Sequence, residues 1–80
     1  MIQISFNYFA KTIAFKIVHT RDNDDFQGNL QWIKSNIDPP DRTYNEHTRA
    51  FIVKDLAKYA RKFALIRKAV KNKRRTITIF

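Results

Sequence analysis

The chain of 80 residues contains no cysteine, one glycine and two prolines. Without cysteine, neither disulfide bonds nor thiolate metal sites can stabilise the fold. The scarcity of glycine and proline indicates regular secondary structure joined by short loops. No apolar run approaches the roughly 20 residues that a membrane-spanning helix needs, and no signal peptide is visible. We therefore expect an intracellular protein, in the cytoplasm or nucleoid, with no membrane partner.

Acidic residues are scarce in the second half of the chain. Residues 1–40 carry four basic and four acidic side chains, whereas residues 41–80 carry twelve basic and three acidic ones, so the whole net charge of +9 arises there. Between Leu56 and Arg75 nine residues are basic and none is acidic. Such self-repulsion is costly for a small fold and indicates a polyanionic partner, although a solvated, solubilising face is the alternative.

Apolar residues are plentiful, at 44% of the chain, with seven phenylalanines, three tyrosines and one tryptophan. This content is too high for a disordered basic tail. It favours one folded domain, residues 1–80, whose apolar side chains are needed for the core. A membrane surface is therefore a less suitable partner than nucleic acid.

The first 18 residues alternate between apolar and polar side chains, with one short connection at residues 9–11. Two alternating runs separated by a short gap predict an antiparallel hairpin. A second, shorter hairpin is predicted from strands at residues 42–44 and 49–54 around the polar turn 45–48. Residues 76–80 alternate again and predict a last strand.

Two helices are predicted between these strands. Asp22, Asp24 and Asp25 suit the start of a helix, and helix capping explains them without the alternative of a metal site. Apolar residues then follow at helical spacing until the prolines end the helix: Phe26, Leu30, Ile33 and Ile37. Asp55 is expected to cap a second helix that runs to about Asn72. The order β-β-α-β-β-α-β predicts an α+β fold, with two helices on one face of a small, mostly antiparallel sheet.

Little in the chain suits catalysis. The two histidines, His19 and His47, fall at a strand end and in a predicted turn. No serine has the context of a nucleophile elbow, and Gly28 alone cannot form a phosphate-binding glycine loop. We expect no enzymatic activity, no cofactor and no metal site.

The candidate nucleic-acid-binding residues form three groups. The first lies on the second hairpin and comprises Arg42, Tyr44 and Arg49. The second lies on the exposed side of the second helix, around an exposed Leu65, and comprises Lys58, Arg61, Lys62 and Lys68. The third follows that helix, where cations also favour the helix dipole, and comprises Lys71, Lys73, Arg74 and Arg75. Arg67 falls within the apolar arc, from which its long side chain is expected to reach solvent.

Two aromatic residues have open interpretations. Tyr44 either stacks on a base or sugar between Arg42 and Arg49, or packs in the core beside Phe51. Trp32 lies off the apolar stripe of the first helix. It is either a stacking or partner contact or a cover for the edge of a small core.

The stretch from about Asp24 to Phe80 resembles the HARP-type domains found beside annealing-helicase motors and related small helicase-associated modules. The matching segments are 30–34, 41–45 and 48–53, although Phe51 stands where the family commonly has tryptophan and a proline pair lengthens one connection. The resemblance implies binding to single-stranded or forked DNA.

Two functions follow as hypotheses. The first is a basic module that binds DNA, or less favourably RNA, with little sequence preference, through phosphate contacts and aromatic stacking. The second is a phage or mobile-element interaction module that binds an acidic protein or a nucleoprotein complex.

Overall fold

The N-terminal hairpin forms the centre of the sheet. The computed structural model describes residues 1–80, and its first strands are β1 (Ile2–Asn7) and β2 (Thr12–Ile17). Ile4 lies opposite Phe15 and Ser5 opposite Ala14, so the alternation of the sequence gives one apolar and one mainly polar face. Asn7 accepts a hydrogen bond from the Ala10 backbone through its side chain and thereby closes the connection. The predicted hairpin is confirmed.

Three further strands complete a five-stranded sheet in the order β3-β4-β2-β1-β5, with every neighbouring pair antiparallel. The added strands are β3 (Arg42–Asn45), β4 (Ala50–Val53) and β5 (Thr76–Ile79). β3 and β4 form the second hairpin, and β5 pairs with β1 at the opposite edge. This arrangement confirms the predicted α+β class and the antiparallel sheet.

The first helix, α1 (Asn23–Asn36), begins where the aspartates predicted it. The Asp22 carboxylate accepts a hydrogen bond from the Asp25 backbone at 2.8 Å, which satisfies one of the free amides of the first turn. The helix ends before Ile37, whose backbone is extended. A single turn of 3-10 helix, Pro39–Asp41, then leads into β3.

The second predicted helix is two helices, which corrects the expectation of one helix up to Asn72. α2 (Leu56–Lys62) is capped by Asp55, and α3 (Ala64–Lys71) follows after Phe63, whose φ of −115° and ψ of 120° are extended. The Phe63 ring stacks on Tyr59 and also contacts Trp32 of α1, with centroid distances of 6.3 and 5.8 Å. The break therefore lets one ring join the packing of two helices.

Arg67 lies just after the break. Its side chain is exposed on α3, as expected of an arginine that reaches solvent from the apolar arc. Its guanidinium lies 3.4 Å from the carbonyl oxygen of Arg61, which lies near the end of α2. Leu65 is exposed, as predicted.

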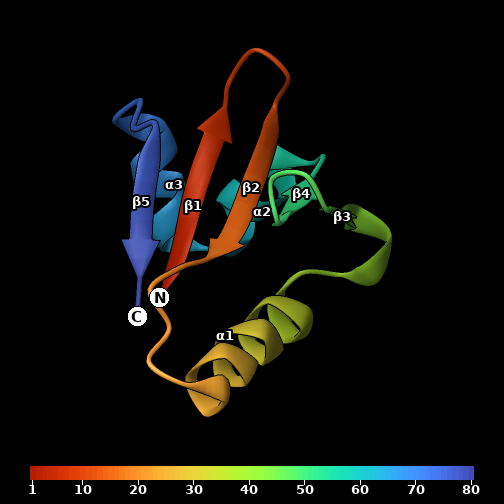
Figure 1. The fold of residues 1–80 in the computed structure, drawn as a ribbon. Coiled ribbons are helices and arrows are strands. Elements are labelled where there is room, and N and C mark those ends of the chain that lie inside the picture. Colours follow the sequence, from red (N-terminus) through yellow and green to blue (C-terminus); the bar gives the residue numbers. More distant parts are fainter.

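All three helices contribute side chains to the core on the same face of the sheet. In Figure 1, α2 and α3 lie behind the sheet and α1 lies at its lower end, while the face toward the viewer is uncovered. Side chains from β1, β2 and β4 meet the helices in a single core, whose largest fully buried members are Tyr59, Phe15 and six isoleucines. None of the helices combines the length and apolar composition needed to cross a bilayer.

Gly28 provides a test of the packing around α1. It lies in the interior of the helix, and nothing is within 4 Å of the place where a Cβ atom would stand. Gly28→Ala is expected to raise the free energy of unfolding by about 0.5–1 kcal/mol, because alanine loses less backbone entropy on forming a helix. Urea denaturation measures the change, with the exposed neighbour Gln27→Ala as the control. A loss of stability in Gly28→Ala would contradict the open space at this position.

Candidate nucleic-acid interface

Most of the basic side chains have no acidic partner. Of the sixteen lysines and arginines, only Arg21 and Lys58 lie within 4.0 Å of a carboxylate. The pair of Arg21 with Asp25 is long, at 3.9 Å, and Arg21 itself is exposed. Lys58 is therefore the one cation in the chain with close ion pairs, and the remaining fourteen have no carboxylate within 4.0 Å.

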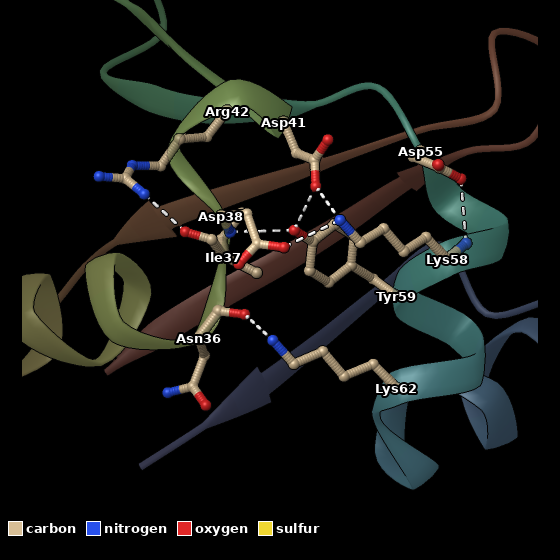
Figure 2. Close-up of polar contacts among 9 residues, drawn as sticks. All are labelled: Asn36, Ile37, Asp38, Asp41, Arg42, Asp55, Lys58, Tyr59 and Lys62. Carbon is tan, nitrogen blue, oxygen red and sulfur yellow. Dashed lines mark hydrogen bonds and ion pairs between the residues drawn. The ribbon is translucent and has the colours of Figure 1, made fainter.

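Lys58 connects α2 to the segment after α1. Its Nζ atom lies 2.9 Å from Oδ2 of Asp38 and 2.6 Å from Oδ2 of Asp41 (Figure 2). Hydrogen bonds from Lys58 hold the pKa of both carboxyl groups below the ordinary value, and the hydrogen bonds to Asp38 and Asp41 in turn raise the pKa of Lys58. The charge of this predicted site residue is thus already neutralised within the protein.

The hydroxyl group of Tyr59 completes this network. It donates to Oδ2 of Asp41 at 2.7 Å and accepts from the backbone N–H of Asp38 at 3.0 Å (Figure 2). The Tyr59 side chain is fully buried, and burial together with the bond to Asp41 raises its pKa. Lys58, Tyr59, Asp38 and Asp41 are called the junction below.

Two more predicted site residues hold the end of α1. Nη1 of Arg42 donates to the carbonyl oxygen of Ile37 at 2.5 Å, and Nζ of Lys62 donates to that of Asn36 at 2.8 Å (Figure 2). Carbonyl groups at a helix C-terminus lack partners within the helix, and cations stabilise the negative end of its dipole. Lys62 also lies 5.4 Å from the Phe63 ring centroid. Arg42 and Lys62 therefore have structural partners beside the junction.

A set of five predicted basic residues lies together where α3 turns into β5. This set, called the basic corner below, is exposed throughout and comprises Lys68, Lys71, Lys73, Arg74 and Arg75. None of the five has a carboxylate partner. Lys68 and Arg74 border a shallow hollow of about 240 Å³ between α3 and β5.

Backbone hydrogen bonds hold the basic corner in place. The amides of Lys73 and Arg74 donate to the carbonyls of Val70 and Ala69, at 3.1 and 3.0 Å, and so close the end of α3. The Tyr8 hydroxyl donates to the Arg74 carbonyl oxygen at 2.6 Å and thereby joins the turn to the first hairpin. The positions of the basic side chains are therefore supported by both α3 and the sheet.

A second site lies between α1 and the second hairpin. This aromatic groove has a volume of about 670 Å³, and its apolar walls are Ile17, Phe26, Leu30, Tyr44 and Phe51. The exposed cations Lys34 and Arg49 also line it. The Tyr44 ring is 50% exposed and meets the Phe51 ring edge-on, with 5.0 Å between the centroids. Tyr44 therefore packs beside Phe51 and also presents ring surface to solvent.

Trp32 and Arg61 belong to neither the basic corner nor the aromatic groove. Trp32 is half-buried among the rings of Phe15, Phe63 and Phe80, with centroid distances of 6.5, 5.8 and 5.6 Å. This cluster joins α1 to the sheet and to the α2–α3 break. Arg61 is exposed on the last turn of α2.

Sequence reasoning missed Lys34 and Phe9 as candidate residues. Lys34 lies in the electrically neutral half of the chain, and only the fold brings it to the groove that Arg49 also lines. Phe9 is fully exposed in the connection between β1 and β2. Its signal was an aromatic residue in a predicted turn, where polar residues are usual.

The chain matches no protein-family model, and comparison with curated proteins and with solved structures gave no match. The resemblance to HARP-type domains consequently remains an expectation from short segments. The properties of the site rest on its own geometry.

Removing the Tyr59 hydroxyl is expected to destabilise the protein. Tyr59→Phe leaves the Asp38 amide and the Asp41 carboxylate without one partner each, and such a loss at a partly buried, charged hydrogen bond costs about 1–3 kcal/mol. Thermal or urea denaturation measures the effect, and Tyr44→Phe at an exposed ring is the control. Equal stability of Tyr59→Phe and the wild type would show that the junction contributes nothing through this hydroxyl.

The junction also predicts a loss of stability in acid. Asp38 and Asp41 have lowered pKa values in the folded state, so their contribution is complete above the unfolded pKa of about 4 and is lost as the pH falls through the folded values. At the alkaline end, the raised pKa of Lys58 means that the same contacts are lost only as the pH rises above about 10. Melting temperatures between about pH 6 and 2 should therefore fall less steeply in Asp38→Asn/Asp41→Asn than in the wild type.

A control for this pH dependence must remove the same charge elsewhere. Asp24→Asn/Glu46→Gln changes two exposed acidic residues outside the junction. It should keep the wild-type acid dependence more closely than the junction variant does. Parallel pH profiles for the junction variant and the wild type would contradict the assignment.

Proposed function

We propose that the protein binds nucleic acid with little sequence preference, single-stranded or forked DNA foremost, and that the basic corner provides the phosphate contacts. The observation that carries this proposal is the cluster of five exposed, unpaired cations on one supported turn. Phosphate contacts supply most of the affinity in sequence-tolerant binding and position the strand. The preference for DNA and for single or forked strands comes from the resemblance to HARP-type domains.

The dipole of α3 explains only part of the basic corner. Lys68 and Lys71 lie in the last turn of the helix, where a cation stabilises the carbonyl end. Lys73, Arg74 and Arg75 lie beyond the helix, and the dipole effect falls off within one turn. Their mutual repulsion is relieved when a polyanion binds, so a nucleic-acid backbone is the natural counter-charge.

The proposed activity is binding without catalysis. It requires no cofactor and no metal ion. The aromatic groove, with the half-exposed Tyr44 ring, supplies the stacking surface that the proposal also includes.

Neutralising the basic corner is expected to weaken binding. Lys68→Gln/Lys71→Gln/Arg74→Gln should lower the affinity for a single-stranded oligonucleotide at least tenfold in about 50 mM salt. It should also reduce the slope of log K against log salt by roughly 0.7 for each lost contact. Fluorescence anisotropy titrations at several salt concentrations measure both quantities. Unchanged melting temperature shows that the exposed substitutions leave the fold intact.

The matched control removes three charges from other exposed positions. Lys11→Gln/Lys16→Gln/Lys54→Gln has the same net charge as the corner variant and should bind more tightly than it does. Equal weakening by both variants would contradict a specific role for the basic corner. The wild type should be titrated with single-stranded, duplex and forked DNA and with structured RNA, and failure to bind any of them at low salt would overturn the proposed function.

One observation favours the second candidate function, docking to an acidic protein or a nucleoprotein complex. Phe9 is fully exposed in the first hairpin, next to Tyr8, which is bonded to the basic corner. An exposed aromatic residue beside cations is typical of a protein-contact anchor. If Phe9→Ala leaves all nucleic-acid titrations unchanged, Phe9 is free for such a partner. A loss of affinity would place it in the nucleic-acid interface instead.

A further inference from the structure

We propose that the aromatic groove between α1 and the second hairpin receives one unstacked base of a single strand, with the adjacent phosphates on Lys34 and Arg49. This inference rests on the proposed function and adds to it the site and the form of the bound nucleotide. It also separates two modes of contact: phosphates at the basic corner and a base in the groove.

The groove exists because the apolar stripe of α1 is only half covered. Ile33 and Ile37, in its C-terminal half, are fully buried against the sheet. Leu30 is half-buried and Phe26 is 39% exposed, and both line the groove. Exposed apolar surface at this position is unfavourable in the free protein and is covered when a flat apolar ligand binds.

Tyr44 and Phe51 form a prepared wall for a base. Their rings meet at 61°, so Phe51 supports Tyr44 from one side while half of the Tyr44 surface stays open. Both residues lie on paired strands, at opposite positions of the β3–β4 ladder. A ring held in this way loses little conformational entropy when a base stacks on it.

The charges around the groove select an anionic ligand. Lys34 and Arg49 are the charged residues that line it, and no acidic side chain does so. The volume of about 670 Å³ lies within the range of roughly 300–1,000 Å³ that is usual for small-ligand sites. A nucleotide combines the flat apolar faces that the walls accept with the negative charge that the two cations attract. A second copy of this chain does not combine these properties, because it carries its own net charge of +9.

The backbone of Arg49 lies in a tight turn of the second hairpin. Its φ of 53° places it in the left-handed region, which asparagine and glycine adopt more readily than arginine does. The preceding turn is held by Asn45, whose side chain accepts from the His47 amide at 2.9 Å. Lys11, His19 and Lys73 have similar φ values of 52–58°, so this conformation defines the turn at Arg49 and is not itself a sign of binding.

The test compares a normal strand with an abasic strand. Fluorescence anisotropy is measured with a thymidine oligonucleotide of about twelve residues and with an abasic strand of the same phosphate count. Tyr44→Ala should weaken binding of the normal strand about tenfold and leave the abasic strand unchanged. Leu65→Ala, on α3 and equally exposed, is the control and should affect the two strands alike.

Arg49→Asn provides a second variant that cannot fail through misfolding of the turn. Asparagine suits the left-handed conformation, so the melting temperature should stay the same or rise. Affinity for the normal strand should fall, and the salt slope should decrease by about 0.7. Retention of both wild-type affinity and wild-type slope would remove Arg49 from the site.

The outcomes distinguish this inference from the function on which it rests. If Tyr44→Ala binds both strands as tightly as the wild type does, the base site and the stacking part of the proposed function are wrong, while phosphate binding at the basic corner stands. If the wild type binds neither strand at low salt, both are wrong. A concentration-dependent dimer that Tyr44→Ala abolishes in sedimentation would show that a second copy occupies the groove, which also overturns the inference.

Discussion

The sheet has one apolar face, and this constraint determines where the helices and the basic residues lie. Strict alternation in β1 and β2 sends every large apolar side chain to the same side, and three helices must share it. A continuous second helix would place one straight apolar stripe on this face. The extended residue Phe63 instead divides the helix and lets its ring reach Trp32 and Tyr59 together. The break therefore brings one ring into contact with both α1 and α2 on the shared face.

The same constraint divides the basic residues into two kinds. Where α1 and α2 converge, Lys62 and Arg42 donate to the carbonyl oxygens at the end of α1. Lys58 donates to Asp38 and Asp41, and Asp41 also accepts from the buried Tyr59. Farther away, at the turn from α3 to β5, the cations are exposed and meet no carboxylate. Position along the chain does not separate these kinds, since Arg61 and Lys62 are neighbours, yet only the lysine bonds to α1.

Most of the secondary structure could be predicted from local sequence patterns. The N-terminal hairpin, the Asp22 cap and the succession of strands along the chain depend on alternation, capping and turn residues within a few positions of one another, and these were predicted correctly. The order of the strands within the sheet depends on pairing between distant segments and was not predicted. The break at Phe63 was missed because apolar spacing continues across it and neither glycine nor proline marks it. The partners of Lys58 were missed because Asp38 and Asp41 come from another element, 17 or more residues away. The aromatic groove combines residues of α1, β2 and the second hairpin, so Lys34 acquires its place only through tertiary structure.

The two surfaces complement each other in physical terms. The phosphate contacts proposed for the basic corner would act over several ångströms, weaken with salt and not depend on the base. A groove with a restrained tyrosine acts only at contact and requires a base that is already unstacked, because paired bases do not expose their faces. A protein with both surfaces would bind duplex and single strands electrostatically but gain stacking energy only from the single strand. Under the proposed function, stacking on Tyr44 would favour unpaired strands, and this would add a physical reason to the preference that the resemblance to helicase-associated domains implies.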